Sequence, residues 1–271
     1  MKNADRSDEV AAPKYEVSDR SIAIADRKLE RHIMATRPIF IPTNPDLSKS
    51  HITIDDLTKT QNIDFTWHTG LTISDKQQSI ASLHENAKLI DNISKILEIS
   101  TRSTERIGVA LSAFNLKIKS AKGRQFSVES VYQSSKVFSS SQGEIQYLDL
   151  LYKSPAEAKT DSRLKTSGNI IAFRTFGKKE KEWSINPISA YYNWIYLNAL
   201  IQHSEYHEPL LEYHAFTDIE FNPKKSLNCQ AYAAALFCSL YKNDLLEETM
   251  KTSNNFLSLY HKQNETLDLF G

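Results

Sequence analysis

The sequence predicts a helix-rich α+β domain with a small β-sheet and an N-terminal extension. The chain has 271 residues, of which 40% are apolar and 24% charged, an ordinary globular composition with enough apolar side chains for a sizeable core. Helix start signals and three-to-four-residue apolar periodicity recur along it, and short apolar runs of strand length lie between them. One principal domain with appendages is therefore expected.

Charge and cysteine content exclude some classes of protein. The 33 Lys and Arg residues balance the 33 Asp and Glu residues, so any contact with a polyanion must come from a local patch. Cys229 and Cys238 lie nine residues apart in one apolar segment and would not meet on a helix, which indicates reduced thiols. With no secretory signal, lipidation motif or long apolar run, we expect a cytoplasmic protein without membrane contact.

The first 33 residues carry seven basic and seven acidic side chains and few large apolar ones, so we expect a mobile tail or a marginal helix there. From residue 34 to 107 we expect an N-terminal part packed on the main domain, which spans 108–271. The elements expected in this part are strands at 34–42, 65–68 and 95–100, a polar loop at 101–106, and a helix capped by Ser74 with apolar residues at 80, 83, 87 and 90.

Residues 108–116 are apolar and are expected to form a strand, followed by a turn at 122–124 and a helix over 126–138. In that helix, spacings of four and three residues place Glu129, Gln133 and Lys136 on one side. Ser127 is the expected N-cap, with Glu129 in the first turn, where the helix dipole favours an anion. An acid, an amide and an amine on one face indicate either a catalytic site or a solvated polar stripe.

A second helix start is marked by Ser154, Pro155 and Glu157, which have the spacing of an N-cap with a reciprocal capping carboxylate. This helix is expected to carry Lys159 and Arg163 four residues apart, either as a clamp for phosphate or as part of a solvated charged face.

We expect a strand over 170–176, followed by a charged turn over 178–182 that ends at Trp183. The aromatic and apolar residues over 188–202 predict a buried helix. Asn228 is the expected cap of a helix from Cys229 to Tyr241, whose alanines allow close packing. The segment before it, from Phe216, presents Asp218 and Glu220 near Lys224 and Lys225, which suits either a sugar or phosphate site or a solvated edge strand.

A metal site is not expected. His203 and His207 have helical spacing, but they lie at a predicted helix end, where the dipole also favours histidine, and the sequence shows no third ligand.

Five matches taken in order resemble the NADAR family, the YbiA-like N-glycosidases. Leu111-Ser-Ala-Phe-Asn is similar to the family's Leu-Ser-Asn-Phe, and Val128-Glu-Ser-Val-Tyr-Gln-Ser-Ser-Lys136 to its Val-Glu-His-Tyr-Phe-Gln-Ala-x-Lys helix. Ser154-Pro-Ala-Glu-Ala-Lys159 resembles its Thr-Pro-x-Glu-Ala-Lys, Trp183 stands where a family Trp is expected, and 216–220 matches the later acidic strand. The resemblance covers about 108–245 and implies a NADAR-like catalytic domain.

Departures from the common pattern point to one branch of the family. Ala113 replaces Asn, Ser130 replaces His, Ser162 replaces Gly, and 222–228 replaces a loop containing Trp and Gly. Together with the added segment 34–107, these changes resemble the branch found as antitoxins beside DarT-type toxins, which ADP-ribosylate guanine in DNA. The resemblance implies an ADP-ribosylglycohydrolase that uses no cofactor. Its expected substrate is ADP-ribosylated guanine in DNA, and the cognate toxin is a possible second partner.

The matched motifs suggest roles for individual residues. The resemblance and the chemistry of N-glycoside cleavage make Glu129, Lys136 and Asp218 the catalytic candidates, with Lys136 either a neutral nucleophile passing through an imine or a charge-binding group. The candidates for binding the substrate are Phe114, Tyr132, Gln133, Lys159, Arg163, Trp183, Glu220 and Asn228. Lys159 and Arg163 are candidates for the diphosphate, Tyr132 and Trp183 for stacking on adenine or guanine, and Asp218 or Glu220 for the ribose hydroxyls or a second carboxylate role.

Two other functions remain open. One is a non-catalytic antitoxin that binds ADP-ribose or the toxin. The other is the ordinary family activity on small phosphorylated intermediates of the riboflavin pathway.

Overall fold

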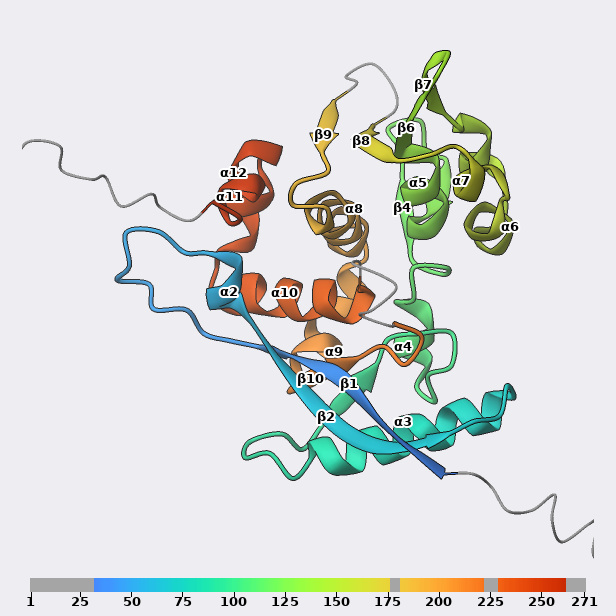
Figure 1. Ribbon diagram of the computed structural model, residues 1–271. Helices are drawn as coiled ribbons and strands as arrows, with labels where there is room; N and C mark the ends of the chain where they lie inside the picture. The colour runs from blue at the N-terminus through green and yellow to red at the C-terminus, as the bar shows by residue number, and fades with distance from the viewer. Residues whose placement is uncertain (1–31, 176–180, 222–228, 262–271) are drawn as a thin grey trace, which may run out of the picture.

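The computed structural model describes residues 32–175, 181–221 and 229–261. Strands β1 (His32–Pro42) and β2 (Thr58–His68) form a long antiparallel ribbon, joined through α2 (Ile54–Leu57). The ribbon belongs to a four-stranded sheet in the order β2-β1-β10-β3, in which β10 (Ala215–Thr217) and β3 (Ile96–Glu98) run parallel (Figure 1). The predicted strands at 34–42, 65–68 and 95–100 are confirmed, and the first two are longer than predicted.

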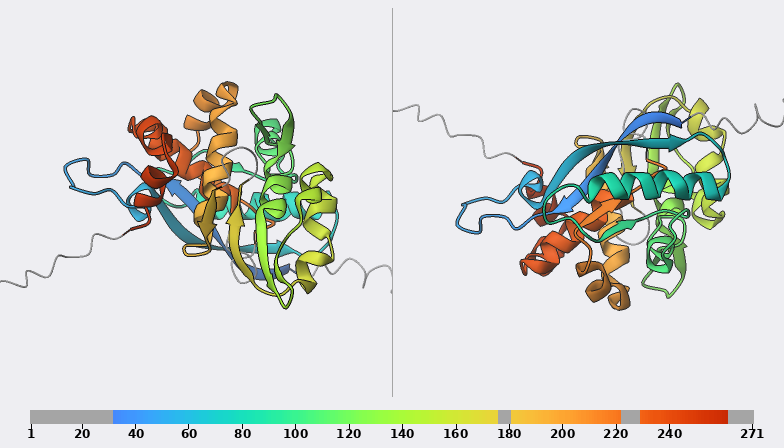
Figure 2. Two further views of the ribbon diagram at one scale, coloured as in Figure 1. Left: turned by 90° about the horizontal axis from the view of Figure 1, so that it is seen from above. Right: turned by 90° about the horizontal axis from the view of Figure 1, so that it is seen from below.

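Helix α3 (Ile73–Ala87) covers one face of this sheet, as Figure 2 shows from below. Side chains alternate along the ribbon, so Ile39, Ile63 and Phe65 point to α3 and bury a small core with its apolar stripe. The helix begins after Thr72 rather than Ser74. Asp75, three residues after Thr72, completes a reciprocal capping box there, whereas Gln77, three residues after Ser74, donates to the carbonyl of Arg102 instead.

The predicted strand at 108–116 is wrong, because this segment forms α4 (Arg106–Ala110) and a series of turns. Gly108 packs so closely on β3 that a Cβ there would lie 2.1 Å from the carbonyl oxygen of Glu98. The side chains of Ser112 and Asn115 both donate to the carbonyl of Val109 and hold the turns. A hairpin of β4 (Lys117–Lys119) and β5 (Gln125–Ser127) follows, turning at Gly123 with a φ of 78°.

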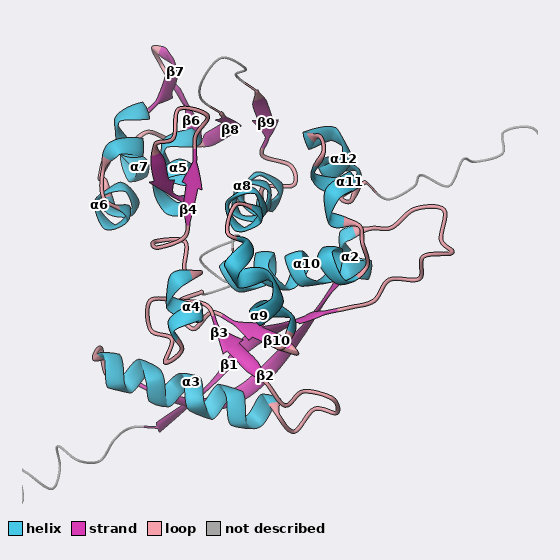
Figure 3. Cartoon of the chain, turned by 180° about the vertical axis from the view of Figure 1, so that it is seen from behind, coloured by secondary structure: helices cyan, strands magenta, loops and turns pink. Residues whose placement is uncertain are grey.

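Helix α5 (Val128–Ser135) ends one residue before Lys136, which begins strand β6 (Lys136–Ser140). The predicted helix over 126–138 is therefore shorter than expected at both ends. Strand β6 lies in an antiparallel sheet of order β7-β6-β8-β9, with β7 Gly143–Gln146, β8 Ile170–Arg174 and β9 Glu182–Ser184. Helices η1 (Leu148–Tyr152), α6 (Pro155–Thr160) and α7 (Arg163–Thr166) lie beside α5 (Figure 3).

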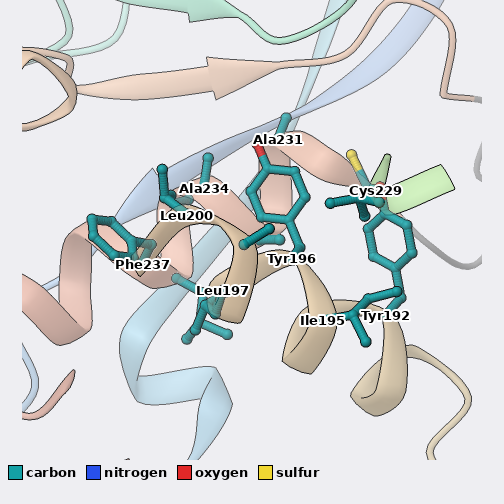
Figure 4. Packing of buried hydrophobic residues seen from close by; sticks show 14 of the residues in the cluster. Tyr192, Ile195, Tyr196, Leu197, Leu200, Cys229, Ala231, Ala234 and Phe237 are labelled. Carbon is teal, nitrogen blue, oxygen red and sulfur yellow. The ribbon is translucent and has the colours of Figure 1, made fainter. Parts of the chain in front are cut away.

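The main core forms where α8 (Ser189–Ile201) meets α10 (Gln230–Lys242), both largely buried as predicted. Tyr196 and Leu200 of α8 lie against Ala231, Ala234 and Phe237 of α10, because small side chains let the two helices approach closely (Figure 4). The remaining elements are η2 (Ser204–Tyr206), α9 (His207–Leu211), α11 (Leu246–Met250) and α12 (Ser253–Ser258). None of the helices in the described segments is long and apolar enough to cross a membrane.

Both cysteines are buried free thiols, which agrees with the predicted absence of a disulfide between them. Cys229 itself is the N-cap of α10, while its predicted cap, Asn228, lies outside the described residues.

Candidate active site

A buried chain of hydrogen bonds joins the three polar side chains that the sequence places together. Nε2 of Gln133 donates to Oε1 of Glu129 at 2.7 Å, and Nζ of Lys136 donates to Oε1 of Gln133 at 2.7 Å. Glu129 is 6% exposed and Gln133 7%, so they are not part of a solvated stripe. The predicted gathering of an acid, an amide and an amine is confirmed, although Lys136 joins it from a strand rather than from the helix.

The start of α5 fixes the position of Glu129. The Ser127 hydroxyl accepts from the backbone N–H of Ser130 at 3.0 Å, as an N-cap does, which confirms the predicted cap. The backbone N–H of Glu129 donates to the carbonyl of Ala113 at 2.9 Å and ties this turn to the loop after α4. The carboxylate thus projects from a helix N-terminus whose dipole stabilises its negative charge.

The Lys136 amine is held in a partly dehydrated environment. The pKa of Lys136 is lowered from 10.5 to about 8: burial is the main cause, the carboxylate of Glu129 acts in the opposite direction, and the charge of Lys159 adds to the lowering. The amine also lies 4.9 Å from the ring centroid of Tyr132. Near neutral pH, a substantial fraction of the Lys136 side chains therefore carries the neutral, nucleophilic amine.

A second acid lies at the end of β10, where Glu98 of β3 holds the backbone on both sides of Asp218. Glu98 is 2% exposed and accepts from the hydroxyl of Thr217 at 2.7 Å and from the backbone N–H of Ile219 at 2.9 Å. Burial and then the charge of Glu98 hold the pKa of Asp218 well above its ordinary range, and burial also raises the pKa of Glu98. This environment favours a protonated Asp218.

Sequence reasoning missed Glu98. The available signal was a single carboxylate within the apolar run Ile96-Leu-Glu-Ile99. An acid at a buried strand position needs specific donors, and the parallel pairing of β3 with β10 supplies them.

The charges of Glu129, Asp218 and Lys159 act on side chains from several surrounding elements. Burial raises the pKa of Tyr192 well above its ordinary value, and the charges of Glu129 and Asp218 both add to this increase. The charge of Lys159 in turn lowers the pKa of both Lys136 and Asp218. The site therefore combines α5, β6, α6, α8 and the end of β10.

Lys159 and Arg163 do not form the predicted clamp on one helix face. Helix α6 ends at Thr160, and Arg163 opens α7. Arg163 instead binds Asp149 at 2.6 Å and Asp161 at 2.8 Å, while Nζ of Lys159 lies 5.2 Å from the ring centroid of Phe114. Only Lys159 of the two acts electrostatically on the candidate site, because Asp161 and Asp149 hold Arg163 elsewhere.

The predicted stacking role of Trp183 is contradicted by its burial. The indole is 2% exposed, with ring centroids 5.6 Å from Tyr191 and 5.4 Å from Trp194, so no free face remains for a base. Tyr132 is 8% exposed and packs edge-on against Tyr192, although its ring faces the amine of Lys136. The family-like Trp is thus a core residue in this chain.

Glu220 is exposed and lies 4.0 Å from the amine of Lys76 and 3.7 Å from Nε of Arg102. These cations come from α3 and the loop after β3, whereas Lys224 and Lys225, its predicted neighbours, and Asn228 lie outside the described residues. Its position next to Asp218 is maintained by its own backbone N–H, which donates to Asp218 at 3.1 Å.

The two histidines considered as metal ligands bind backbone carbonyls. Nε2 of His203 lies 3.0 Å from the carbonyl oxygen of Lys117, and Nε2 of His207 lies 3.0 Å from that of Leu200. Across the described segments, no group of three or more His, Cys, Asp or Glu side chains is arranged to hold a metal ion.

Gln230 and Tyr196 position the loop beneath Glu129. Oε1 of Gln230 accepts from the backbone N–H of Ala113 at 2.6 Å, and its Nε2 donates to the carbonyl of Ile99 at 2.6 Å. The hydroxyl of Tyr196 donates to the carbonyl of Leu111 at 2.8 Å. The site is thus braced from α8 and α10, both of which belong to the main core.

The helix-rich α+β architecture is consistent with a NADAR-type glycohydrolase domain. Residues 35–268 match the family of DarT1-associated NADAR antitoxins, and the chain belongs to that family. The family assigns the chain an antitoxin role and relates it to a DarT toxin. A comparison with curated proteins gave no significant match.

Proposed function

We propose that the chain removes ADP-ribose from guanine in nucleic acid by cleaving the N-glycosidic bond, and so reverses the damage done by a DarT-type toxin. The observation that carries the proposal is the buried hydrogen-bond chain from Glu129 through Gln133 to Lys136, together with a second acid, Asp218, whose charge acts on the same Tyr192 as that of Glu129. The match to DarT1-associated antitoxins supports guanine-linked ADP-ribose as the substrate.

The chemistry requires charge stabilisation at the ribose and a proton for the leaving base. As the bond between the anomeric carbon and the guanine nitrogen breaks, positive charge develops on the ribose, and the carboxylate of Glu129 stabilises it. Asp218 donates its proton to the departing nitrogen, in keeping with its raised pKa.

Lys136 supplies the nucleophile in this proposal. Its neutral amine forms a bond to the anomeric carbon as guanine leaves; the ring oxygen then leaves that carbon and takes one amine proton, which gives a protonated imine that water hydrolyses to free ADP-ribose and the original amine. Lys159, above the ring of Phe114, binds the diphosphate, and Gln133 orients both the carboxylate and the amine.

The test is a mass measurement of the product from an oligonucleotide that carries ADP-ribosylated guanine. The unmodified oligonucleotide is expected with the wild type, whereas Glu129→Gln and Lys136→Ala lower the rate by about 10²-fold or more. Glu85→Gln, at an exposed position of α3, is the matched control. Wild-type turnover by both site variants would remove the proposed catalytic roles.

The same variants separate catalysis from toxin binding. Inactive variants that still protect cells from the toxin would show direct neutralisation, and turnover of small phosphorylated pyrimidine intermediates in a parallel assay would point to the ordinary family activity.

A further inference from the structure

A hollow of about 360 Å³ lies next to the candidate active site, between the β1–β2 ribbon and the N-terminal ends of α8 and α10. Glu129 and Lys136 do not line it, so it is separate from the hydrogen-bond chain described above. Its volume is at the lower end of the range of about 300–1,000 Å³ for ligand pockets, which suits one small group of a larger substrate.

One wall of the hollow follows from the register of the ribbon. Pro38 pairs with Asn62 and Phe40 with Thr60, so all four side chains share one face. This is the face opposite the one that packs on α3. The N-terminal segment 34–68 therefore builds a wall of the hollow with the face that it turns toward α10.

Aromatic rings and amides make up most of the chemistry of the hollow. The ring of Phe40 is itself only 4% exposed and meets Tyr232 of α10 edge-on at 5.5 Å and Phe221 at 6.4 Å, so the partly exposed rings of Tyr232 and Phe221 supply the aromatic surface of the hollow. Asn62 brings an exposed amide to this space, and within the described residues that amide has no hydrogen-bond partner, whereas Asn193 is 1% exposed and donates through Nδ2 to the Tyr260 hydroxyl at 2.9 Å. Aromatic surface with a few amide donors and acceptors is the combination that recognises a purine base by stacking and by its polar edge.

One residue that lines the hollow lies near the proposed acid. Cys229 lines the hollow, and the Cys229 sulfur lies 4.0 Å from Oδ2 of Asp218. Figure 4 shows Cys229 beside Tyr192, the residue whose pKa responds to both Glu129 and Asp218. A group held in the hollow is therefore a neighbour of the reacting centre.

We propose that this hollow is a purine-binding subsite, which holds either the adenine of ADP-ribose or a base of the nucleic-acid strand. The proposal rests on the proposed function, because it assigns a part of that substrate to a place beside Asp218. It gives residues 34–68 a role in substrate binding as well as in the fold.

The test fills the hollow from its exposed rim. Asn62→Trp places a large ring where the base would lie, and Asn62→Ala removes only the amide. Lys59→Trp is the matched control, since Lys59 is an exposed residue of the same strand that points to its other face. Thermal melting of each variant checks the fold, and calorimetry measures binding of ADP-ribose, of ribose 5-phosphate and of an unmodified guanine-containing oligonucleotide.

If adenine is the occupant, Asn62→Trp weakens ADP-ribose binding at least tenfold and leaves ribose 5-phosphate unchanged. If a strand base is the occupant, the same variant weakens the oligonucleotide tenfold and spares ADP-ribose. Unchanged binding of both ligands in a folded Asn62→Trp variant overturns the subsite. Because binding is measured without turnover, a wild type that binds but does not cleave would refute only the proposed reaction.

Discussion

Replacing Lys136 by Met tests the environment on which the proposed nucleophile depends. The folded protein lowers the pKa of Lys136 from 10.5 to about 8. At 1.36 kcal/mol for each pKa unit, the charged amine costs the native state about 3 kcal/mol relative to the neutral one. At pH 7 roughly one Lys136 amine in ten is then neutral. With the ordinary lysine pKa of 10.5, only about three in ten thousand would be.

The sign of the pH dependence follows from the lowered pKa. Between about pH 8 and 10.5 the unfolded chain binds more protons at this position than the folded chain, so the unfolding free energy of the wild type rises with pH across that window. The cost is present in full below about pH 8 and is gone above 10.5. Lys136→Met has no such amine, so its stability relative to the wild type should fall by about 3 kcal/mol from pH 7 to 11.

The assay is urea unfolding of both proteins, followed by circular dichroism at pH values across this window. Groups common to both proteins cancel in the difference, and Lys122→Met, in the exposed turn between β4 and β5, is the control. A difference that stays constant with pH would refute the partly dehydrated amine and with it the case for Lys136 as a nucleophile.

Three further variants test the surroundings of the site. Glu98→Gln removes the charge that raises the pKa of Asp218, so the alkaline limb of the pH–rate profile should move to lower pH, and an unmoved limb would exclude the coupling. Arg163→Ala should cost about 1 kcal/mol in urea unfolding, because its ion pairs are partly exposed, and leave turnover per folded molecule unchanged; a large loss of turnover would restore the predicted clamp. Gln230→Ala leaves a buried amide and a carbonyl unpaired and should cost about 3 kcal/mol by the same measurement, with a loss under about 0.5 kcal/mol contradicting its bracing role.

Local chemistry was enough to predict much of the fold. Ser127 and Ser154 were identified as N-caps because a hydroxyl three residues before a free backbone N–H forms its bond within one turn, without help from the rest of the chain. The buried helices over 188–202 and 229–241 were readable from apolar surface and small residues, and α8 and α10 match them. The helical spacing of Glu129 and Gln133 likewise predicted that they share one face of the helix, and in the structure they form a hydrogen bond there.

The errors arose where distant segments compete with local preference. The apolar run at 108–116 reads as a strand, but Gly108 lies against β3, and Gln230 binds the backbone N–H of Ala113 from more than a hundred residues away. Similarly, Lys136 leaves the helix because its backbone pairs with Phe173 in β8. Arg163 does not share a helix face with Lys159 as predicted, and Asp149, which lies before α6 in the chain, binds its guanidinium.

The sequence by itself determined the helix starts, the buried helices and the acid, amide and amine at 129, 133 and 136, because each depends on groups within a few residues of one another. Only the tertiary structure bonded the carboxylate of Glu98 to the residues on both sides of Asp218 and brought the β1–β2 ribbon to the same hollow as Cys229. Those arrangements depend on strand pairing and burial between segments more than a hundred residues apart, for which no short pattern in the chain carries the information.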